Sequence, residues 1–250
     1  MTPTRPACAV PLLVSALALM LLAAAPAQAQ DISISLGEGD SLSGRAIQLI
    51  ALVTVLSLAP GLAVMITAFP FIITVLSILR QGIGLQQSPP NMLLVSLALF
   101  LTWFVMEPTF TTAWEAGIAP LVAEEIALEE ALPRAIEPFR GFMAARLDGT
   151  TFEAMAALRP DAAGITAGPD APLSVLVPSF MLSEIARAFQ IGFLIFLPFL
   201  IIDLVIAAVL MSMGMMMVPP AIVSLPFKLA FFVIADGWSL LAASLVRGYM

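Results

Sequence analysis

Two long apolar runs follow one another near the C-terminus, at residues 186–210 and 221–246, and the joint between them is also apolar. The joint, residues 211–220, reads MSMGMMMVPP and ends in two prolines that prevent a regular helix from continuing through it. Apolar runs of this length, folded back on each other, predict a helical hairpin of the kind that membranes hold. Membrane hairpins usually turn through polar residues, so this apolar joint predicts contact with protein or with a lumen rather than with water.

The joint is rich in one flexible residue type, because five of its ten residues are methionines: Met211, Met213, Met215, Met216 and Met217. Methionine is unbranched and polarisable, so clustered methionines adapt to irregular surfaces and refill gaps after movement. Two interpretations follow: the methionines only fill space in a tight turn, or one such loop per subunit makes a deformable seal. The residues expected to shape the loop are Gly214, Pro219 and Pro220.

Composition places the whole chain in the membrane class. Of its 250 residues, 61% are hydrophobic and 11% are charged, whereas soluble domains are nearer half apolar and a quarter charged. The net charge of −7 and the single lysine, Lys228, argue against a nucleic-acid partner. There is no histidine, and the one cysteine is Cys8, so metal or cofactor sites and histidine-dependent catalysis are not expected. The chain is therefore predicted not to be an enzyme.

The N-terminal half predicts a targeting segment followed by a first apolar hairpin. Residues 1–29 combine Arg5, an apolar core and an Ala-Gln-Ala end, which is the pattern of a cleaved signal peptide. A retained first helix is the alternative, although the apolar core is shorter than a membrane span. Residues 30–44 read as a polar exported linker, and residues 45–107 as the first hairpin. Within that hairpin, the run 46–79 would make a helix ~51 Å long, so breaks are expected at Pro60-Gly61 and at Phe69-Pro70.

Residues 108–185 form the only long stretch of ordinary polarity, with 11 acidic residues and four arginines. The scarcity of basic residues predicts the periplasmic side for this segment. One helix is expected to stop near Pro133 and a second to follow it. The acidic residues Glu124, Glu125, Glu129 and Glu130 have helical spacing, which favours a solvated helix face over a metal or acid–base site. The resulting fold class is an all-α membrane-class protein: two apolar hairpins with this mainly helical segment between them, and residues 186–250 as the second hairpin.

Charged side chains inside the second hairpin are costly in a membrane and usually pair. If the hairpin is symmetric about Met215–Met216, Asp203 and Lys228 lie level with each other and form the preferred ion pair. Glu184 and Arg247 fall level under the same symmetry. Asp236 is left for a neighbouring subunit or for Arg187. A proton relay through these groups is the functional alternative.

Several strings of the C-terminal third resemble the FliP family of flagellar biosynthesis proteins and their injectisome counterparts, the small export-gate subunits of type III secretion. They are PSFMLSE (178–184), AFQIGF (188–193), FLPFLIIDLVIA (196–207), MGMMMVPP (213–220), SLPFKL (224–229) and DGW (236–238). LSILR (76–80), PPN (89–91) and LALFLTWFVM (97–106) add to the resemblance. The chain departs from the family pattern at Phe71, where relatives usually carry an arginine, so any polar contact made there is in doubt.

The resemblance implies a core pore subunit of the flagellar protein export gate, with the methionine-rich loop as its gasket. Several copies would assemble into a ring or helical pore with Q-type and R-type small subunits, among other export membrane proteins. This assembly would sit inside the basal-body ring of the inner membrane and pass unfolded flagellar proteins. The same subunit of a virulence injectisome is one alternative, although Val218-Pro219-Pro220 favours the flagellum. A small-solute transporter is another, but the chain has no internal repeat and few polar groups.

Overall fold

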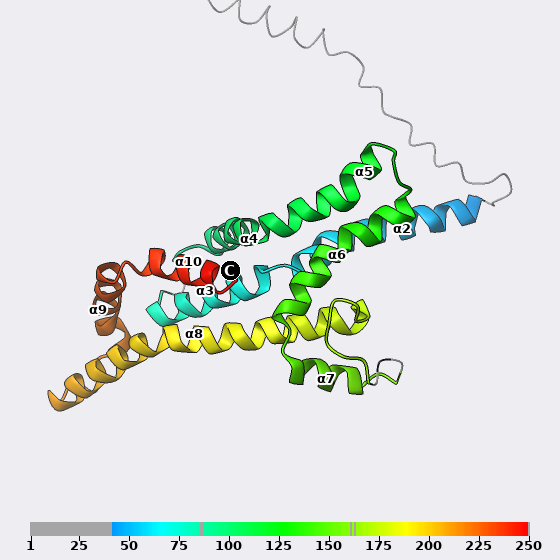
Figure 1. Cartoon of the computed structure of the whole chain (residues 1–250). Coiled ribbons are helices and arrows are strands. Elements are labelled where there is room, and N and C mark those ends of the chain that lie inside the picture. Colours follow the sequence, from blue (N-terminus) through cyan, green and yellow to red (C-terminus); the bar gives the residue numbers. More distant parts are fainter. Residues whose placement is uncertain (1–41, 86–87, 161, 163, 250) are drawn as a thin grey trace, which may run out of the picture. The chain divides into compact units, whose positions relative to one another are not determined.

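The computed structural model describes residues 42–85, 88–160, 162 and 164–249, with the side chains of 42–46, 55 and 59 excepted. The predicted signal peptide (1–29), Cys8 within it and most of the predicted linker lie outside the described residues. The chain divides into two units, residues 1–52 and 53–250. Helix α2 (Leu42–Met65) crosses this division, and the cores and the candidate sites below belong to the second unit. All regular elements of the described residues are helices, which confirms the predicted all-α class (Figure 1).

The first apolar run forms two helices, α2 (Leu42–Met65) and α3 (Phe69–Ile83). The break predicted at Phe69-Pro70 is confirmed: α2 ends just before it, and Pro70 stands in the first turn of α3, where its missing N–H costs no helical hydrogen bond. The break expected at Pro60-Gly61 is wrong, because α2 continues through Pro60. Proline is tolerated inside apolar helices when neighbouring groups or small adjustments satisfy the carbonyl that it frees.

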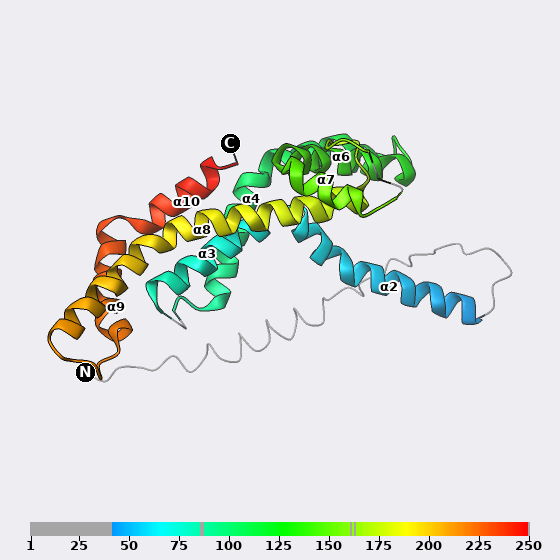
Figure 2. The same cartoon turned by 90° about the horizontal axis from the view of Figure 1, so that it is seen from below.

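Helix α3 is the central element of the main core. Its buried residues recur at three- and four-residue intervals, so they form one face of the helix. That face packs against α4 (Asn91–Ala113) and α8 (Leu173–Ser212), which lie alongside it in both views (Figures 1 and 2). Helix α3 approaches α8 closely at Gly192, where a Cβ atom would stand 2.4 Å from Cδ1 of Ile78. The buried core residues of this cluster include Phe71, Ile72, Val75, Leu76, Leu79, Met106, Ala188 and Phe199.

The segment between the hairpins is helical, but its helices differ from those expected. Helix α4 passes into a short π-helix (Trp114–Ile118) and then α5 (Ala119–Val122). Helix α6 (Leu128–Arg146) runs without interruption through Pro133 and Pro138, so the predicted stop near Pro133 is wrong. Close packing explains the difference: a Cβ on Gly117 would stand 2.7 Å from the Ala131 carbonyl oxygen, so tertiary contact holds α6 where proline alone would interrupt it.

The four glutamates do not share one helical face, so that expectation is also wrong. Glu124 has a positive φ of 58° and lies with Glu125 in the turn after α5. Glu129 and Glu130 stand in the first turn of α6, where the partial positive charge of a helix N-terminus favours carboxylates. Across the described residues, no group of three or more His, Cys, Asp or Glu side chains is placed to hold a metal ion.

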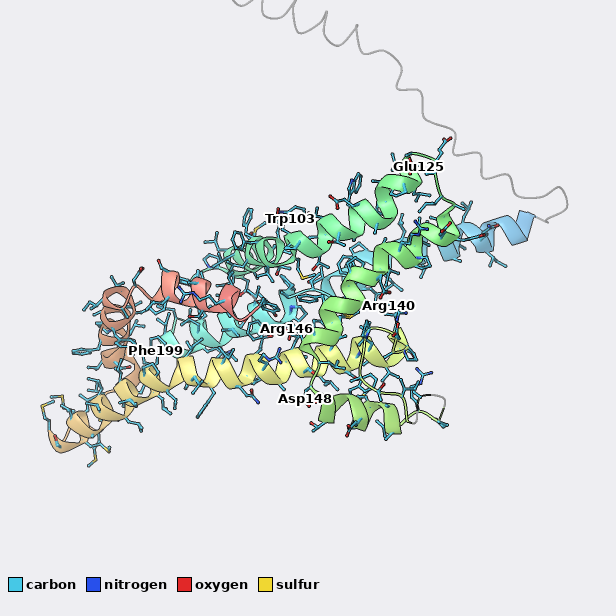
Figure 3. The ribbon with its side chains drawn as sticks, in the orientation of Figure 1. Trp103, Glu125, Arg140, Arg146, Asp148 and Phe199 are labelled. Carbon is cyan, nitrogen blue, oxygen red and sulfur yellow. The ribbon has the colours of Figure 1, made fainter. Side chains whose placement is uncertain are left out.

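A second, smaller core joins the end of α6, α7 (Gly149–Ala157) and the first turns of α8. Its centre is formed by Met143, Phe152 and Phe180, which are fully buried. Arg140 fastens the connecting loop, because its NH1 donates hydrogen bonds to the carbonyl oxygens of Pro169 (2.9 Å) and Ala171 (3.0 Å) (Figure 3). Helix α8 begins 13 residues before the predicted start of the second hairpin at residue 186, and its side chains belong to both cores.

The described helices include three that are long and apolar enough to cross a membrane, within Ile47–Met65, Asn91–Val122 and Leu173–Ser212. A fourth span is possible if α9 (Pro220–Ile234) and α10 (Gly237–Arg247) count together, although they meet at an angle of 61°. Many large apolar side chains of these helices are exposed, among them Phe100, Trp103, Phe193, Leu194, Leu204, Val233 and Ile234. Such surface requires lipid or other protein chains to cover it.

Candidate functional site

The methionine-rich loop closes the second hairpin at the tip where α8 turns into α9 (Figures 1 and 2). Helix α8 ends at Ser212, and Gly214 follows in the left-handed conformation with φ of 75°. The Gly214 amide donates to the Met211 carbonyl oxygen at 3.1 Å, and the Met215 amide to that of Leu210 at 2.9 Å. This pair of hydrogen bonds is the Schellman motif, which ends many helices. The motif needs a positive φ at the position of Gly214, and glycine adopts it without steric cost because it has no Cβ.

The far side of the loop is fixed by proline. Pro219 precedes α9 in an extended conformation, and Pro220 is its first residue, where the missing N–H removes no helical hydrogen bond. Between these two boundaries the methionine side chains point outward, with exposed fractions from 44% at Met215 to 98% at Met217. The five methionines of the loop are thus available to a partner chain or to a lumen.

Asp203 of α8 and Lys228 of α9 meet, as the symmetry of the hairpin suggested. Lys228 Nζ lies 2.6 Å from Oδ2 of Asp203, and Ser224 donates a 2.5 Å hydrogen bond to the other carboxylate oxygen. The lysine is 4% exposed and also donates to the carbonyl oxygen of Gly82 at 3.1 Å. Gly82 stands in the last turn of α3, where the helix dipole favours a cation. One buried ammonium group therefore joins three helices.

Glu184 is the centre of a second buried ionic cluster, and it is fully buried. Arg146 Nε lies 2.8 Å from Oε1 of Glu184, and Arg187 NH1 lies 3.0 Å from the same oxygen. The Tyr249 hydroxyl donates to Oε2. Arg187 is therefore bound to Glu184, and the suggestion that it could serve Asp236 is wrong. Glu184 and Arg247, which the symmetry of the hairpin puts at one level, form no hydrogen bond or ion pair among the described residues, since Glu184 binds Arg146 and Arg187 instead. The reason is the bend between α9 and α10, which removes the symmetry of the hairpin beyond residue 234.

The same cluster holds the C-terminus. The Arg146 guanidinium lies 3.7 Å from the centre of the Tyr249 ring, and its NH1 donates to the Gly248 carbonyl oxygen at 2.8 Å. Phe71 meets the Tyr249 ring edge-on at 5.4 Å, so an aromatic contact occupies the position where the family pattern has an arginine. Burial raises the pKa of Tyr249 above its usual range, and the charge of Glu184 raises it further.

Beside this cluster, Asp148 connects α6 and α7 to α8 (Figure 3). Its Oδ1 accepts hydrogen bonds from the hydroxyl of Thr150 (2.6 Å) and from the amide and hydroxyl of Thr151 (2.8 and 2.9 Å). These hydrogen bonds lower the pKa of Asp148 to about 2, and the bond from the Thr150 hydroxyl has the largest effect. Its own amide donates to Ser183 Oγ at 3.0 Å. Sequence reasoning missed Asp148, although aspartate is one of the residue types that helix N-caps prefer.

Comparison with known proteins agrees with the resemblance seen in the sequence. The family model described as the FliP family matches residues 52–245. The flagellar biosynthetic protein FliP of Caulobacter vibrioides is 53% identical over 213 residues, which cover 85% of this chain and 80% of the relative. Those of Rhizobium meliloti and Bacillus subtilis are 48% and 45% identical, over 84% and 81% of this chain and 86% and 91% of theirs. The chain therefore belongs to the FliP family.

Proposed function

We propose that this chain is a pore-forming subunit of the flagellar protein export gate. Family membership supports a role in flagellar biosynthesis, and the relatives are named as flagellar biosynthetic proteins. The observation that carries the pore role is the tip of the second hairpin, where five exposed methionines are presented on a loop with fixed ends. Several copies around one axis would bring these loops together, and clustered methionine side chains could fill the opening between them.

The same proposal gives the chain its location and its partners. The exposed apolar helices fit the bacterial inner membrane, within the flagellar basal body. The acidic segment 108–185 fits the periplasmic side, because its basic residues are scarce. The partners would be further copies of the chain, Q-type and R-type small subunits, other export membrane proteins and the basal-body ring. Unfolded flagellar proteins would be the substrates.

Deletion of Met215, Met216 and Met217 tests the gasket. We expect the complex to assemble as before, because these side chains are exposed and contribute little to the cores. The membrane should become permeable to small solutes, measured as ion conductance of vesicles that hold the purified complex. Replacing the same three residues with alanine keeps the length of the loop and should give a smaller leak.

Met92 supplies the matched control, because it is 83% exposed on α4 and lies outside the loop. Its replacement by alanine should leave conductance at the wild-type level. An intact complex whose conductance does not change on deletion of the three loop methionines would refute the gasket.

A further inference from the structure

A hollow of about 280 Å³ lies between α8 and α10, and its lining is almost entirely apolar. Each of the two helices contributes residues at three- and four-residue intervals, which is the spacing of one helical face. From α8 they are Ile191, Ile195, Pro198 and Phe199, and from α10 Gly237, Leu240, Leu241, Ser244 and Leu245 (Phe199 is labelled in Figure 3). The hollow is therefore a groove along the facing sides of the two helices, called here the α8–α10 groove.

The α8–α10 groove is long and narrow. Each helix lines it from its first to its last lining residue over eight steps, which is about 12 Å at 1.5 Å per residue. Spread over about 12 Å, its volume gives a mean cross-section of about 23 Å², whereas a helix with its side chains is about 10–12 Å wide. A helix of another subunit can therefore put a side chain at one point of the groove but cannot fill its length. A single hydrocarbon chain matches both dimensions.

Arg247 stands at one end of the groove. It shares a helical face with Leu240 and Ser244, because it follows them by seven and three residues. It also directly follows the apolar run 221–246, so it lies where the chain leaves its apolar part. The residue is exposed, and none of the ion pairs found among the described residues involves it. The groove therefore combines an apolar channel with an available guanidinium group at its end.

We propose that the α8–α10 groove binds one anionic phospholipid. One acyl chain of the lipid lies along the groove, and its phosphate binds Arg247, because a guanidinium group can donate two parallel hydrogen bonds to a phosphate. The groove reaches Ala235 and Gly237 at the bend between α9 and α10, so the acyl chain fills the space that the bend leaves against α8. The inference rests on the membrane location of the chain and is independent of the gasket.

Lipid retention tests the contact of the phosphate with Arg247. The full chain is purified in mild detergent with the subunits that accompany it, and phosphatidylglycerol or phosphatidylcholine is added before native mass spectrometry. We expect phosphatidylglycerol to be retained in preference, and Arg247→Gln to lower its retention at least fivefold, because glutamine carries no charge. Arg134→Gln, at an exposed arginine on α6, is the control and should leave retention unchanged. Equal retention of the two lipids, or no loss in Arg247→Gln, would overturn the proposal.

A photoreactive acyl chain tests the position of the lipid. Phosphatidylglycerol with a diazirine near the end of one acyl chain is reconstituted into vesicles with the purified full chain. The labelled residues should lie within 191–199 and 237–245. Ser244→Phe puts a ring at the wall of the groove and should remove this labelling, whereas Ala208→Phe, at an exposed position of α8 outside the groove, should keep it.

Labelling only outside these two stretches, or unchanged labelling in Ser244→Phe, would overturn the lipid site. So would a photoreactive amino acid at Ser244 that crosslinks to another protein chain in the native membrane, because the groove would then be covered by protein. None of these results bears on the conductance of the complex. Failure of the lipid site therefore leaves the gasket standing, and failure of the gasket leaves the lipid site standing.

Discussion

Replacing Lys228 with methionine tests whether the buried ion pair holds the second hairpin to the first. Methionine keeps an unbranched chain of similar length, so the packing around α9 changes little while the charge is lost. The substitution leaves the Asp203 carboxylate with Ser224 and leaves the Gly82 carbonyl oxygen at the end of α3 without its donor. We expect the free energy of unfolding to fall.

The size of the loss follows from the burial of the two partners. Removing one partner of a fully buried pair costs roughly 3–5 kcal/mol. Lys228 is almost fully buried, but the Asp203 side chain is 34% exposed and can be partly solvated after the lysine is lost. We therefore expect about 3 kcal/mol for Lys228→Met, at the lower end of that range. Asp203→Asn should cost a similar amount, because it leaves a buried ammonium group beside a neutral amide.

The double variant distinguishes a coupled ion pair from two side chains that contribute independently to the free energy of unfolding. With both charges gone, no buried ion is left uncompensated, so the Asp203→Asn, Lys228→Met chain should lose only about 1–2 kcal/mol. The unfolding free energy can be measured by titrating the solubilised full chain with a denaturing detergent and following tryptophan fluorescence. Losses that simply add in the double variant would refute the pairing.

An exposed ion pair in the same chain provides the control. Arg134 NH2 lies 2.5 Å from Oε1 of Glu130 on α6, and both side chains are about half exposed. Pairs of this kind contribute roughly 0–1 kcal/mol. Arg134→Met should therefore change the unfolding free energy far less than Lys228→Met.

Three further substitutions test local packing and charge. Gly192→Ala should destabilise the contact between α3 and α8 by about 1–3 kcal/mol, and Ile78→Ala should restore part of the loss in a double-mutant cycle, because it removes the atoms that clash. Gly214→Ala should cost about 1 kcal/mol in unfolding experiments because the loop needs a positive φ there, whereas Gly141→Ala, inside α6 with open space around its Cβ position, should not destabilise the chain. Asp148 has its pKa lowered from 3.8 to about 2, so its cap is fully present above pH 3.8 and is lost as the pH falls through 2. The protection factors of the α7 amides, which compare their exchange rates with those of an unfolded chain at the same pH, should fall over that range, and Asp148→Ala should make these protection factors low at every pH in it.

The symmetry argument for the second hairpin succeeded close to the turn and failed far from it. Asp203 and Lys228 stand on the two helices that leave the methionine-rich loop directly, so equal distance along the chain gives equal depth. Glu184 stands on α8, which runs unbroken to the loop, but Arg247 is separated from the loop by the bend at Asp236, which redirects α10. Asp236-Gly237 is a dipeptide typical of turns, but it stands inside the apolar run 221–246, whose continuity favours one unbroken helix.

The segment between the hairpins shows the same limit. Its helical character and its charge could be predicted from composition and periodicity. The continuity of α6 through Pro133 could not, because it depends on how closely Gly117 approaches α6 from the π-helix. The Glu184 cluster depends on three parts of the chain that are far apart in the sequence, since Arg146, Glu184 and Tyr249 meet only in the folded molecule.

The ionic clusters and the methionine-rich loop divide the second hairpin into a fixed part and an adaptable part. Lys228 joins α3, α8 and α9, and Glu184 joins α6, α8 and the C-terminus, so the helices on either side of the loop are held by buried charge pairs. The loop beyond them has fixed ends but exposed methionine side chains. A seal that opens for an unfolded polypeptide needs this combination, because its frame has to keep its position while its lining changes shape. Substitution of Lys228 should therefore lower stability without raising the conductance of those complexes that assemble, whereas deletion in the loop should raise conductance without lowering stability.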